Sequence, residues 1–356
     1  MKQLVNQRNS AFVRRKSIFK IVPALLLTVL LLVTAGCSKG SPNAAAESAS
    51  GGSDSGVVLK VGQTGWGNLE QGLKAAGLDN TPYKVEYSVF QGGNLILEAM
   101  AANQVDFGTT SEIPPIFASQ AANGGNFKVV AVQEGNTLNQ EVVVPKDSSI
   151  QTPADLKGKK IAFVKNTTAH YFLLKILQDA GLTWQDIQPV ELSTADGLSA
   201  LISGKVDALA SYGNAIISAH QNGATTLASA KDILSGSFLV TASDSALADT
   251  ARKDAIADYL DRLNQFYDWT RTHQEDWAKI TAAATHQPED QALTTLKEGE
   301  AQRPSHVVAT SKEAIASEQD VADTFTDAGV LSSKVDVSTF WSDALNDKLK
   351  APTASK

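Results

Sequence analysis

Along most of the chain, the spacing of apolar residues alternates between the spacing typical of a strand and the spacing typical of a helix. Short apolar or alternating runs predict strands at residues 57–63, 83–90, 127–132, 159–165, 188–192 and 206–212. Apolar residues three and four positions apart predict helices at residues 67–77, 94–103, 169–181, 195–205 and near Pro114. Because the two types alternate with few hairpin turns, we expect an α/β fold whose mostly parallel sheets are flanked by helices.

The series of strands and helices occurs twice. The stretch "LEAMAANQVDFGTTSE" from Leu97 aligns with "LSALISGKVDALASYGN" from Leu198, and both duplication and the chance similarity of two helix–strand units remain open. Extended segments at residues 141–147 and 236–243 bracket the second series and are long enough to cross between two lobes. We therefore expect lobe 1 to contain residues 57–142 and 238–356, with helices from residue 247 onward, and lobe 2 to contain residues 143–237.

The N-terminus has the pattern of an export signal. Residues 1–36 contain six Lys and Arg, no Asp or Glu, and the apolar run 21–33, which is shorter than the roughly 20 residues of a spanning helix. This predicts a signal peptide over residues 1–36. The following "TAGC" resembles the lipobox of bacterial lipoproteins, which implies that Cys37 carries the lipid and anchors the protein to the membrane. A buried odd cysteine is the alternative.

Residues 37–56 are mostly Ser, Gly and Ala, a composition that predicts a flexible linker after the acylated cysteine. Cys37 is the only cysteine, so the folded part has neither a disulfide nor a cysteine metal site. Without residues 1–36 the chain has 25 basic and 38 acidic residues, a formal charge of −13. This excess of negative charge argues against nucleic acid as a partner.

Hydroxyl-rich turns between strands and helices are the candidate site. The turns "GQTGWGN" (62–68), "GTTSEIPP" (108–115) and "NTTAHYF" (166–172) each follow a strand and open a helix, where free N–H groups favour an anion. The candidates are Gln63, Gly65, Trp66, Thr110, Ser111, Glu112, Thr167, Thr168, Ala169, His170, Tyr212, Gly213 and Asn214.

Structural roles compete with binding at several of these positions. Thr110 and Ser111 are equally compatible with simple helix caps, His170 with a surface residue, and Tyr212–Asn214 with a turn. For Trp66 we favour ligand contact, because a flexible loop offers it little core to join. We find no nucleophile elbow, phosphate loop or metal-ligand spacing, so we expect no enzyme activity, cofactor or metal, and Ser111 acts as a donor.

Three stretches give the chain a family resemblance: "VFQGGNLILEAMAANQVDFGTTSEIPPIFA", "VVVPKDSSIQTPADLKGKKIAFVKNTTAHYFLLKILQDAGLTWQDIQPVEL" and "GKVDALASYGN". They resemble the periplasmic-type receptors of ABC importers for aliphatic sulfonates, in the family that includes taurine-, nitrate- and thiamine-precursor-binding proteins. The resemblance implies a type II periplasmic-binding fold with two hinge strands. It also implies a sulfonate head group held at residues 110–112 and 167–170, with Gln91 and the other candidates lining the cleft.

The resemblance also implies the partners: a small organosulfonate, an ABC permease and, through the lipid, the outer face of the membrane. We expect a monomer. Nitrate, taurine and a thiamine precursor remain alternative ligands. A desulfinase-like enzyme on the same fold and a ligand sensor that docks to a membrane receptor remain alternative functions.

Overall fold

The computed structural model describes residues 56–122 and 124–349, which belong to one compact unit. The signal peptide expected at residues 1–36, the lipid-bearing Cys37 and all of the linker except Gly56 lie outside the described residues. No helix in the described ranges is long and apolar enough to cross a membrane.

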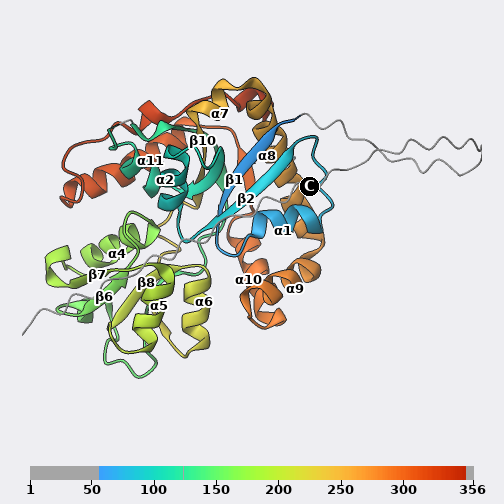
Figure 1. Ribbon diagram of the computed structural model, residues 1–356. Coiled ribbons are helices and arrows are strands. Elements are labelled where there is room, and N and C mark those ends of the chain that lie inside the picture. Colours follow the sequence, from blue (N-terminus) through green and yellow to red (C-terminus); the bar gives the residue numbers. More distant parts are fainter. Residues whose placement is uncertain (1–55, 123, 350–356) are drawn as a thin grey trace, which may run out of the picture. The chain divides into compact units, whose positions relative to one another are not determined.

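The first sheet, sheet A, has six strands in the order β11-β4-β10-β3-β1-β2 (Figure 1). The strands β2, β1 and β3 are parallel, whereas β10 and β11 pair antiparallel with their neighbours. The strands of sheet A are β1 (Val58–Thr64), β2 (Lys84–Phe90), β3 (Phe107–Ser111), β4 (Phe127–Glu134), β10 (Ser237–Ser243) and β11 (His306–Val308).

The second sheet, sheet B, has five strands in the order β7-β6-β8-β5-β9. The strands β7, β6 and β8 are parallel, and β5 pairs antiparallel with both β8 and β9. The strands of sheet B are β5 (Gln140–Val144), β6 (Lys160–Phe163), β7 (Gln188–Glu191), β8 (Ala208–Tyr212) and β9 (Thr225–Ser229).

The expected α/β fold with two lobes is confirmed, but the sheets are mixed rather than mostly parallel. The reason is the path of the chain, because a strand that enters a sheet from the other lobe does so without a helical crossover and runs against its neighbours. The chain crosses between the lobes at residues 135–139 and 230–236. The boundary expected after residue 142 therefore lies inside β5, and the one after residue 237 lies at the start of β10.

Helices follow most of the parallel strands, as the apolar periodicity predicts. They are α1 (Asn68–Ala75), α2 (Gly93–Ala101), α3 (Ile113–Ala118), α4 (Thr168–Asp179), α5 (Thr194–Ile202), α6 (Asn214–Gln221), α7 (Asp244–Ala248), α8 (Thr250–Thr272), α9 (Gln274–Thr285), α10 (Glu289–Gln302) and α11 (Lys312–Asp327). We expected helices from residue 247 onward, but after α11 the chain forms two 3-10 turns, Val337–Phe340 and Asn346–Lys348.

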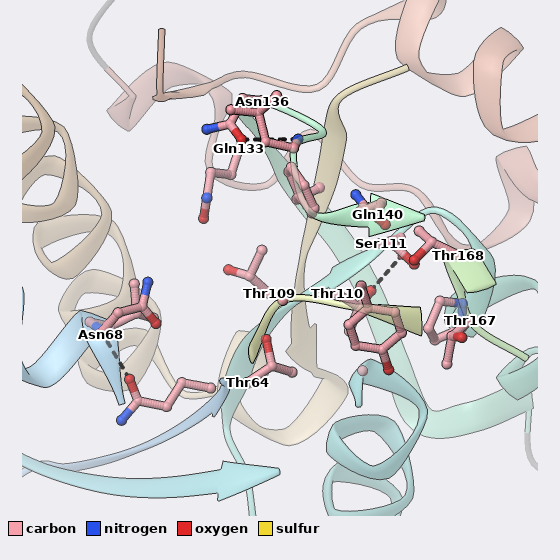
Figure 2. Close-up of a pocket in the computed structure, with 18 residues that line it drawn as sticks. Thr64, Asn68, Thr109, Thr110, Ser111, Gln133, Asn136, Gln140, Thr167 and Thr168 are labelled. Carbon is pink, nitrogen blue, oxygen red and sulfur yellow. Dashed lines mark hydrogen bonds between the residues drawn. The ribbon is translucent and has the colours of Figure 1, made fainter. Parts of the chain in front are cut away.

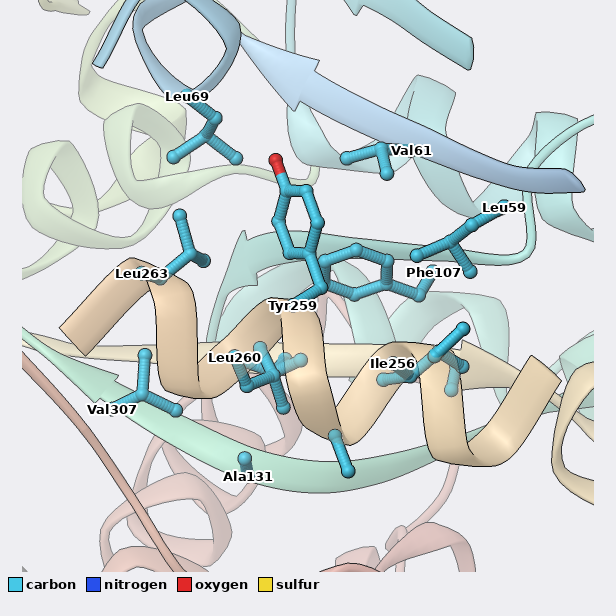
Figure 3. Packing of buried hydrophobic residues seen from close by; sticks show 14 of the residues in the cluster. Leu59, Val61, Leu69, Phe107, Ala131, Ile256, Tyr259, Leu260, Leu263 and Val307 are labelled. Atoms are coloured by element: carbon cyan, nitrogen blue, oxygen red, sulfur yellow. The ribbon is translucent and has the colours of Figure 1, made fainter. Parts of the chain in front are cut away.

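The long helix α8 covers one face of sheet A (Figure 3). Its Ile256, Tyr259, Leu260 and Leu263 are fully buried and lie against strand residues such as Phe107. The rings of Phe107 and Tyr259 meet edge to face, with centroids 5.1 Å apart. This packing fixes β1 and β3 against α8, and the candidate site lies beyond their carboxyl ends.

The two aligned aspartates have the same role in both lobes. The Asp106 carboxylate accepts a hydrogen bond from the N–H of Lys60 at 2.9 Å, and the Asp207 carboxylate accepts one from the N–H of Lys160 at 2.8 Å. In each pair the aspartate N–H donates back to the lysine carbonyl at 2.8 Å. Asp106 thus links the residue before β3 to β1, and Asp207 links the residue before β8 to β6. The aligned stretches are therefore equivalent in structure.

Candidate functional site

A cavity of about 270 Å³ lies beyond the carboxyl ends of β1, β3 and β8 (Figure 2). This is where an open α/β sheet is expected to hold a ligand. No lining residue is charged, and most present a hydroxyl or an amide. The lining residues are Gln63, Thr64, Asn68, Leu69, Gly93, Thr109, Thr110, Ser111, Pro114, Gln133, Asn136, Leu138, Gln140, Thr167, Thr168, Tyr212, Gly213 and Phe238.

Five helices begin at this cavity. The lining includes the first residue of α1, α2 and α4, the N-cap of α6, and a proline in the first turn of the short α3. None of these five starts has an N-cap side chain that accepts a hydrogen bond, whereas α5, α7, α8 and α11 are each capped by a Ser or Asp side chain. At α1 the Gln63 side chain accepts a hydrogen bond from the N–H of Leu69. The first N–H groups of a helix have no partner within the helix, so these starts leave donors and positive dipole ends available to an anion.

The hydroxyls at the cavity differ in whether they are free to donate. Thr110 Oγ1 donates to the carbonyl of Ser111 at 2.9 Å, and Thr167 Oγ1 donates to the carbonyl of Val164 at 2.7 Å. The hydroxyls of Thr64, Thr109, Ser111 and Thr168 have no hydrogen bond within the described part of the chain. Of these, Ser111 ends β3 just before α3 and Thr168 opens α4, and both also line an adjoining cavity. Ser111 and Thr168 are therefore our candidate side-chain donors for an anionic group.

Glu112 is turned away from the cavity. The residue is 4% exposed, and its carboxyl accepts hydrogen bonds from Ser235 at 2.5 Å and from Ser317 at 2.7 Å. Burial raises the pKa of Glu112, and the two serine hydrogen bonds oppose that shift. The predicted ligand role of Glu112 is thus not supported by its position, since the side chain links β3 to the second crossing and to α11.

His170 and Ala169 are also outside the cavity lining. The His170 ring is buried among Phe163, Trp184 and Phe325, with centroid distances of 5.0, 5.0 and 5.1 Å. Burial, together with the charge of Lys165, lowers the pKa of His170 to about 4. His170 is therefore neutral at pH 7 and supports the start of α4 from within the core.

Trp66 joins a core that the sequence did not indicate. Its ring lies 5.4 Å from the ring of Trp277 in α9, and it packs against the cluster under α8. The premise that the loop offers no core is wrong, because the partner lies 211 positions further along the chain. The structure places neither Trp66 nor Gly65 in the cavity lining.

Gln91 and Tyr212 join the two lobes beside the cavity. The Tyr212 hydroxyl donates to the Gln91 carbonyl at 3.3 Å, and Thr194 Oγ1 donates to Gln91 Oε1 at 2.8 Å. Burial raises the pKa of Tyr212 to about 12, against the effect of its hydrogen bond with Thr167, so its hydroxyl is neutral. Tyr212 and Gly213 line the cavity, whereas Gln91 and Asn214 do not.

The structure adds lining residues for which the sequence gave no signal. Gln133, Asn136, Leu138, Gln140 and Phe238 come from the two crossings and the strands beside them. Only the position of the crossings could have identified them. Asn68 was not among the candidates, although it is the last residue of the turn 62–68 that we singled out, and it is the first residue of α1.

A second, larger cavity of about 630 Å³ lies near Arg303 and is a poorer candidate. Arg303 is already paired with Glu134 at 2.8 Å and also donates to the carbonyl of Ser235. Among the described residues, α11 is the one helix that starts at this cavity, and it is capped by Ser311. In the described ranges no group of three or more His, Cys, Asp or Glu could hold a metal ion.

Comparison with known proteins places the chain in a family. A family model described as "ABC transporter, phosphonate, periplasmic substrate-binding protein" matches residues 63–285. An Escherichia coli (strain K12) protein named for binding aliphatic sulfonates is 32% identical over 259 residues, which cover 71% of this chain and 78% of that protein.

Solved structures that resemble this chain include proteins named for the same kind of binding. The alkanesulfonate-binding protein SsuA from Xanthomonas axonopodis pv. citri, bound to MOPS, is 28% identical, with a TM-score of 0.70 over 80% of this chain and 97% of that one. The desulfurization enzyme DSZB, at 17% identity and a TM-score of 0.57, shares the fold over 82% of this chain and 98% of its own. The chain belongs to the family of periplasmic substrate-binding proteins of ABC transporters.

Proposed function

We propose that this protein captures an organosulfonate in the 270 Å³ cavity and delivers it to an ABC permease. One observation carries the proposal: the cavity has no charged residue but is surrounded by five uncapped helix starts. Such a site stabilises an anion with N–H and hydroxyl donors and with helix dipoles alone. The head group is held by Ser111, Thr168 and the neighbouring N–H groups.

The protonation chemistry favours a sulfonate over a phosphonate. A sulfonate is a monoanion at any physiological pH and only accepts hydrogen bonds. A phosphonate monoanion also carries an O–H donor, which needs an acceptor, and its dianion calls for cationic partners. The cavity has no carboxylate or cation in its lining, and the nearby Glu112 carboxyl is already engaged by two serines.

Binding rather than catalysis fits the available side chains. The described residues contain no cysteine, because the single cysteine of the sequence is Cys37. No histidine or carboxylate lines the cavity to act as a general base for Ser111. A desulfinase-like reaction through a cysteine therefore has no nucleophile here.

The membrane anchor is a second part of the proposal. Acylated Cys37 holds the protein at the outer face of the membrane, and residues 38–56 tether the binding unit, which acts as a monomer. A Cys37→Ser variant should move from the membrane fraction to the soluble fraction. Retention in the membrane fraction after this change would contradict the anchor.

Isothermal titration calorimetry tests the ligand class. The purified full-length protein in a non-ionic detergent is titrated with propane-1-sulfonate, propylphosphonate, nitrate and taurine. We expect propane-1-sulfonate to bind with a dissociation constant near the micromolar range, corresponding to about −8 kcal/mol. Tighter binding of the phosphonate or of nitrate would overturn the sulfonate assignment.

A further inference from the structure

Four side-chain amides line the cavity in addition to Gln140. They are Gln63, Asn68, Gln133 and Asn136. In Figure 2, Asn68, Gln133 and Asn136 lie on one side of the cavity, and Ser111, Thr167 and Thr168 lie on the other. The proposed head-group end and the amide end are therefore distinct, and the amide end receives the remainder of the ligand.

Gln63 presents an unused donor at the amide end. Its Oε1 accepts a hydrogen bond from the N–H of Leu69 at 3.1 Å, which fixes the orientation of the amide. Its Nε2 is buried without a hydrogen-bond partner, and the residue is only 2% exposed. A buried donor without a partner is costly, so this position favours a ligand atom that accepts a hydrogen bond.

Thr109 presents a second unpaired group beside Gln63. Its Oγ1 is also buried without a partner and lines the same cavity. The parallel pairing of β1 and β3 aligns Gly62 with Gly108, so Gln63 and Thr109 are the next residues along neighbouring strands. Residues aligned in this way point to the same face of a sheet, which brings the amide donor and the hydroxyl together.

The unpaired groups lie a short distance from the proposed head-group end. Thr109 and Ser111 are two residues apart on β3, about 7 Å along the strand, and their side chains share one face of sheet A. Phe238 pairs with Ser111 on β3 and with Gln133 on β4, so its ring adds an apolar surface on the same face. The distance from Ser111 to Thr109 suits a short aliphatic chain that ends in a polar group.

We infer that the ligand is a sulfonate whose far end carries an uncharged hydrogen-bonding group, such as a hydroxyl, ether or amide. The inference rests on the proposed function, because Ser111 and Thr168 hold the sulfonate. A distal ammonium has no carboxylate in the lining to pair with, and a distal carboxylate has no Lys or Arg. A purely alkyl tail leaves Gln63 Nε2 and Thr109 Oγ1 without partners.

Three sulfonates with the same number of heavy atoms test the inference by calorimetry on the full-length protein in a non-ionic detergent. They are 4-hydroxybutane-1-sulfonate, pentane-1-sulfonate and 4-aminobutane-1-sulfonate. We expect the hydroxylated ligand to bind about tenfold more tightly than the alkyl ligand, because a site built to bond a hydroxyl disfavours the analogue that lacks it. We expect the ammonium ligand to bind more weakly than the hydroxylated one.

Two threonine variants test whether Thr109 causes the preference for the hydroxylated ligand. Thr109→Val removes the unpaired hydroxyl and should reduce the tenfold preference to less than about threefold. Thr241→Val is the matched control, since its hydroxyl donates to the Gly108 carbonyl within the same sheet and lies outside the cavity. Thr241→Val should leave the ratio of the two affinities unchanged.

The outcomes separate the inference from the proposed function. If pentane-1-sulfonate binds as tightly as the hydroxylated ligand, the inference is wrong and the sulfonate receptor stands. If none of the three sulfonates binds while another anion does, the proposed function fails and the inference fails with it. An equal change of the affinity ratio in Thr109→Val and Thr241→Val would also contradict the inference.

Discussion

The N–H of Gly135 donates a hydrogen bond to the carbonyl of Gly236 at 3.0 Å, which joins the two segments that cross between the lobes. The contact is close because Gly236 has no side chain. A Cβ at this position would lie 2.5 Å from the Gly135 carbonyl oxygen, and the backbone has a φ of +73°. The Gln133–Gln140 segment and Phe238, which line the cavity, flank this junction.

Gly236→Ala should lower the free energy of unfolding by at least about 2 kcal/mol more than Gly204→Ala. Both glycines have a positive φ, which costs a non-glycine residue roughly 1–2 kcal/mol. Only Gly236 also has backbone in the way, because a Cβ at Gly204 meets no atom within 4 Å. Urea unfolding of both variants measures the difference, and equal destabilisation would show that the junction tolerates a side chain.

Trp66→Leu should change stability and leave binding intact. The substitution removes the contact with the ring of Trp277 and should lower the free energy of unfolding by about 1–2 kcal/mol. Because Trp66 does not line the cavity, the affinity for propane-1-sulfonate should stay within about twofold of the original. A large loss of affinity in a folded variant would place Trp66 at the ligand after all.

His170 should make the protein less stable as the pH falls from about 6.5 to about 4. The folded pKa of about 4 lies below the ordinary histidine value of 6.5, so the unfolded chain binds the proton first and stability is lost across this window. The loss attributable to this group is about 3 kcal/mol. The difference between the original protein and His170→Phe, measured by urea unfolding at pH 4, 5, 6 and 7, isolates this contribution. Identical pH slopes would contradict it.

Glu318 should make the protein less stable as the pH rises, whereas His170 does so as the pH falls. Its carboxyl is fully buried, has one oxygen without a partner and accepts a hydrogen bond from Trp341 Nε1 at 2.5 Å. Burial raises its pKa well above the usual value, so the folded state holds the proton longer and stability falls as the pH rises above about 4.5. Glu318→Gln keeps an acceptor for Trp341 and cannot ionise. Its stability relative to the original protein should therefore increase from pH 5 to pH 8, and a constant difference would refute this assignment.

The local sequence pattern predicted which segments form helices and strands better than it predicted which segments pack together. The turn before α3 and the start of α4 were found because strand, hydroxyl-rich turn and helix follow one another in sequence, and Thr110, Ser111, Thr167 and Thr168 do line one cavity. Trp66, in contrast, does not line that cavity, and its partner Trp277 is remote in sequence. Short-range periodicity carries no information about such a contact.

The mixed sheets and the lining residues from the two crossings could not be predicted from local sequence pattern either. The pairing of Phe238 with both Ser111 and Gln133 depends on where β10 inserts into sheet A, which its own apolar pattern does not specify. Arg303 binds Glu134 and the Ser235 carbonyl, next to the crossings, through contacts that only the assembled fold creates.

The central claim is that free donors at helix starts, without any charged side chain, hold the sulfonate. The most direct test is the dissociation constant for propane-1-sulfonate, measured by calorimetry for the original protein, Ser111→Ala and Glu112→Gln. Hydrogen bonds to a charged group contribute about 1.5–3 kcal/mol, so Ser111→Ala should weaken binding at least about tenfold. Glu112→Gln should stay within about threefold, because that side chain faces Ser235 and Ser317. Unchanged affinity in Ser111→Ala, or a larger loss in Glu112→Gln, would contradict the account.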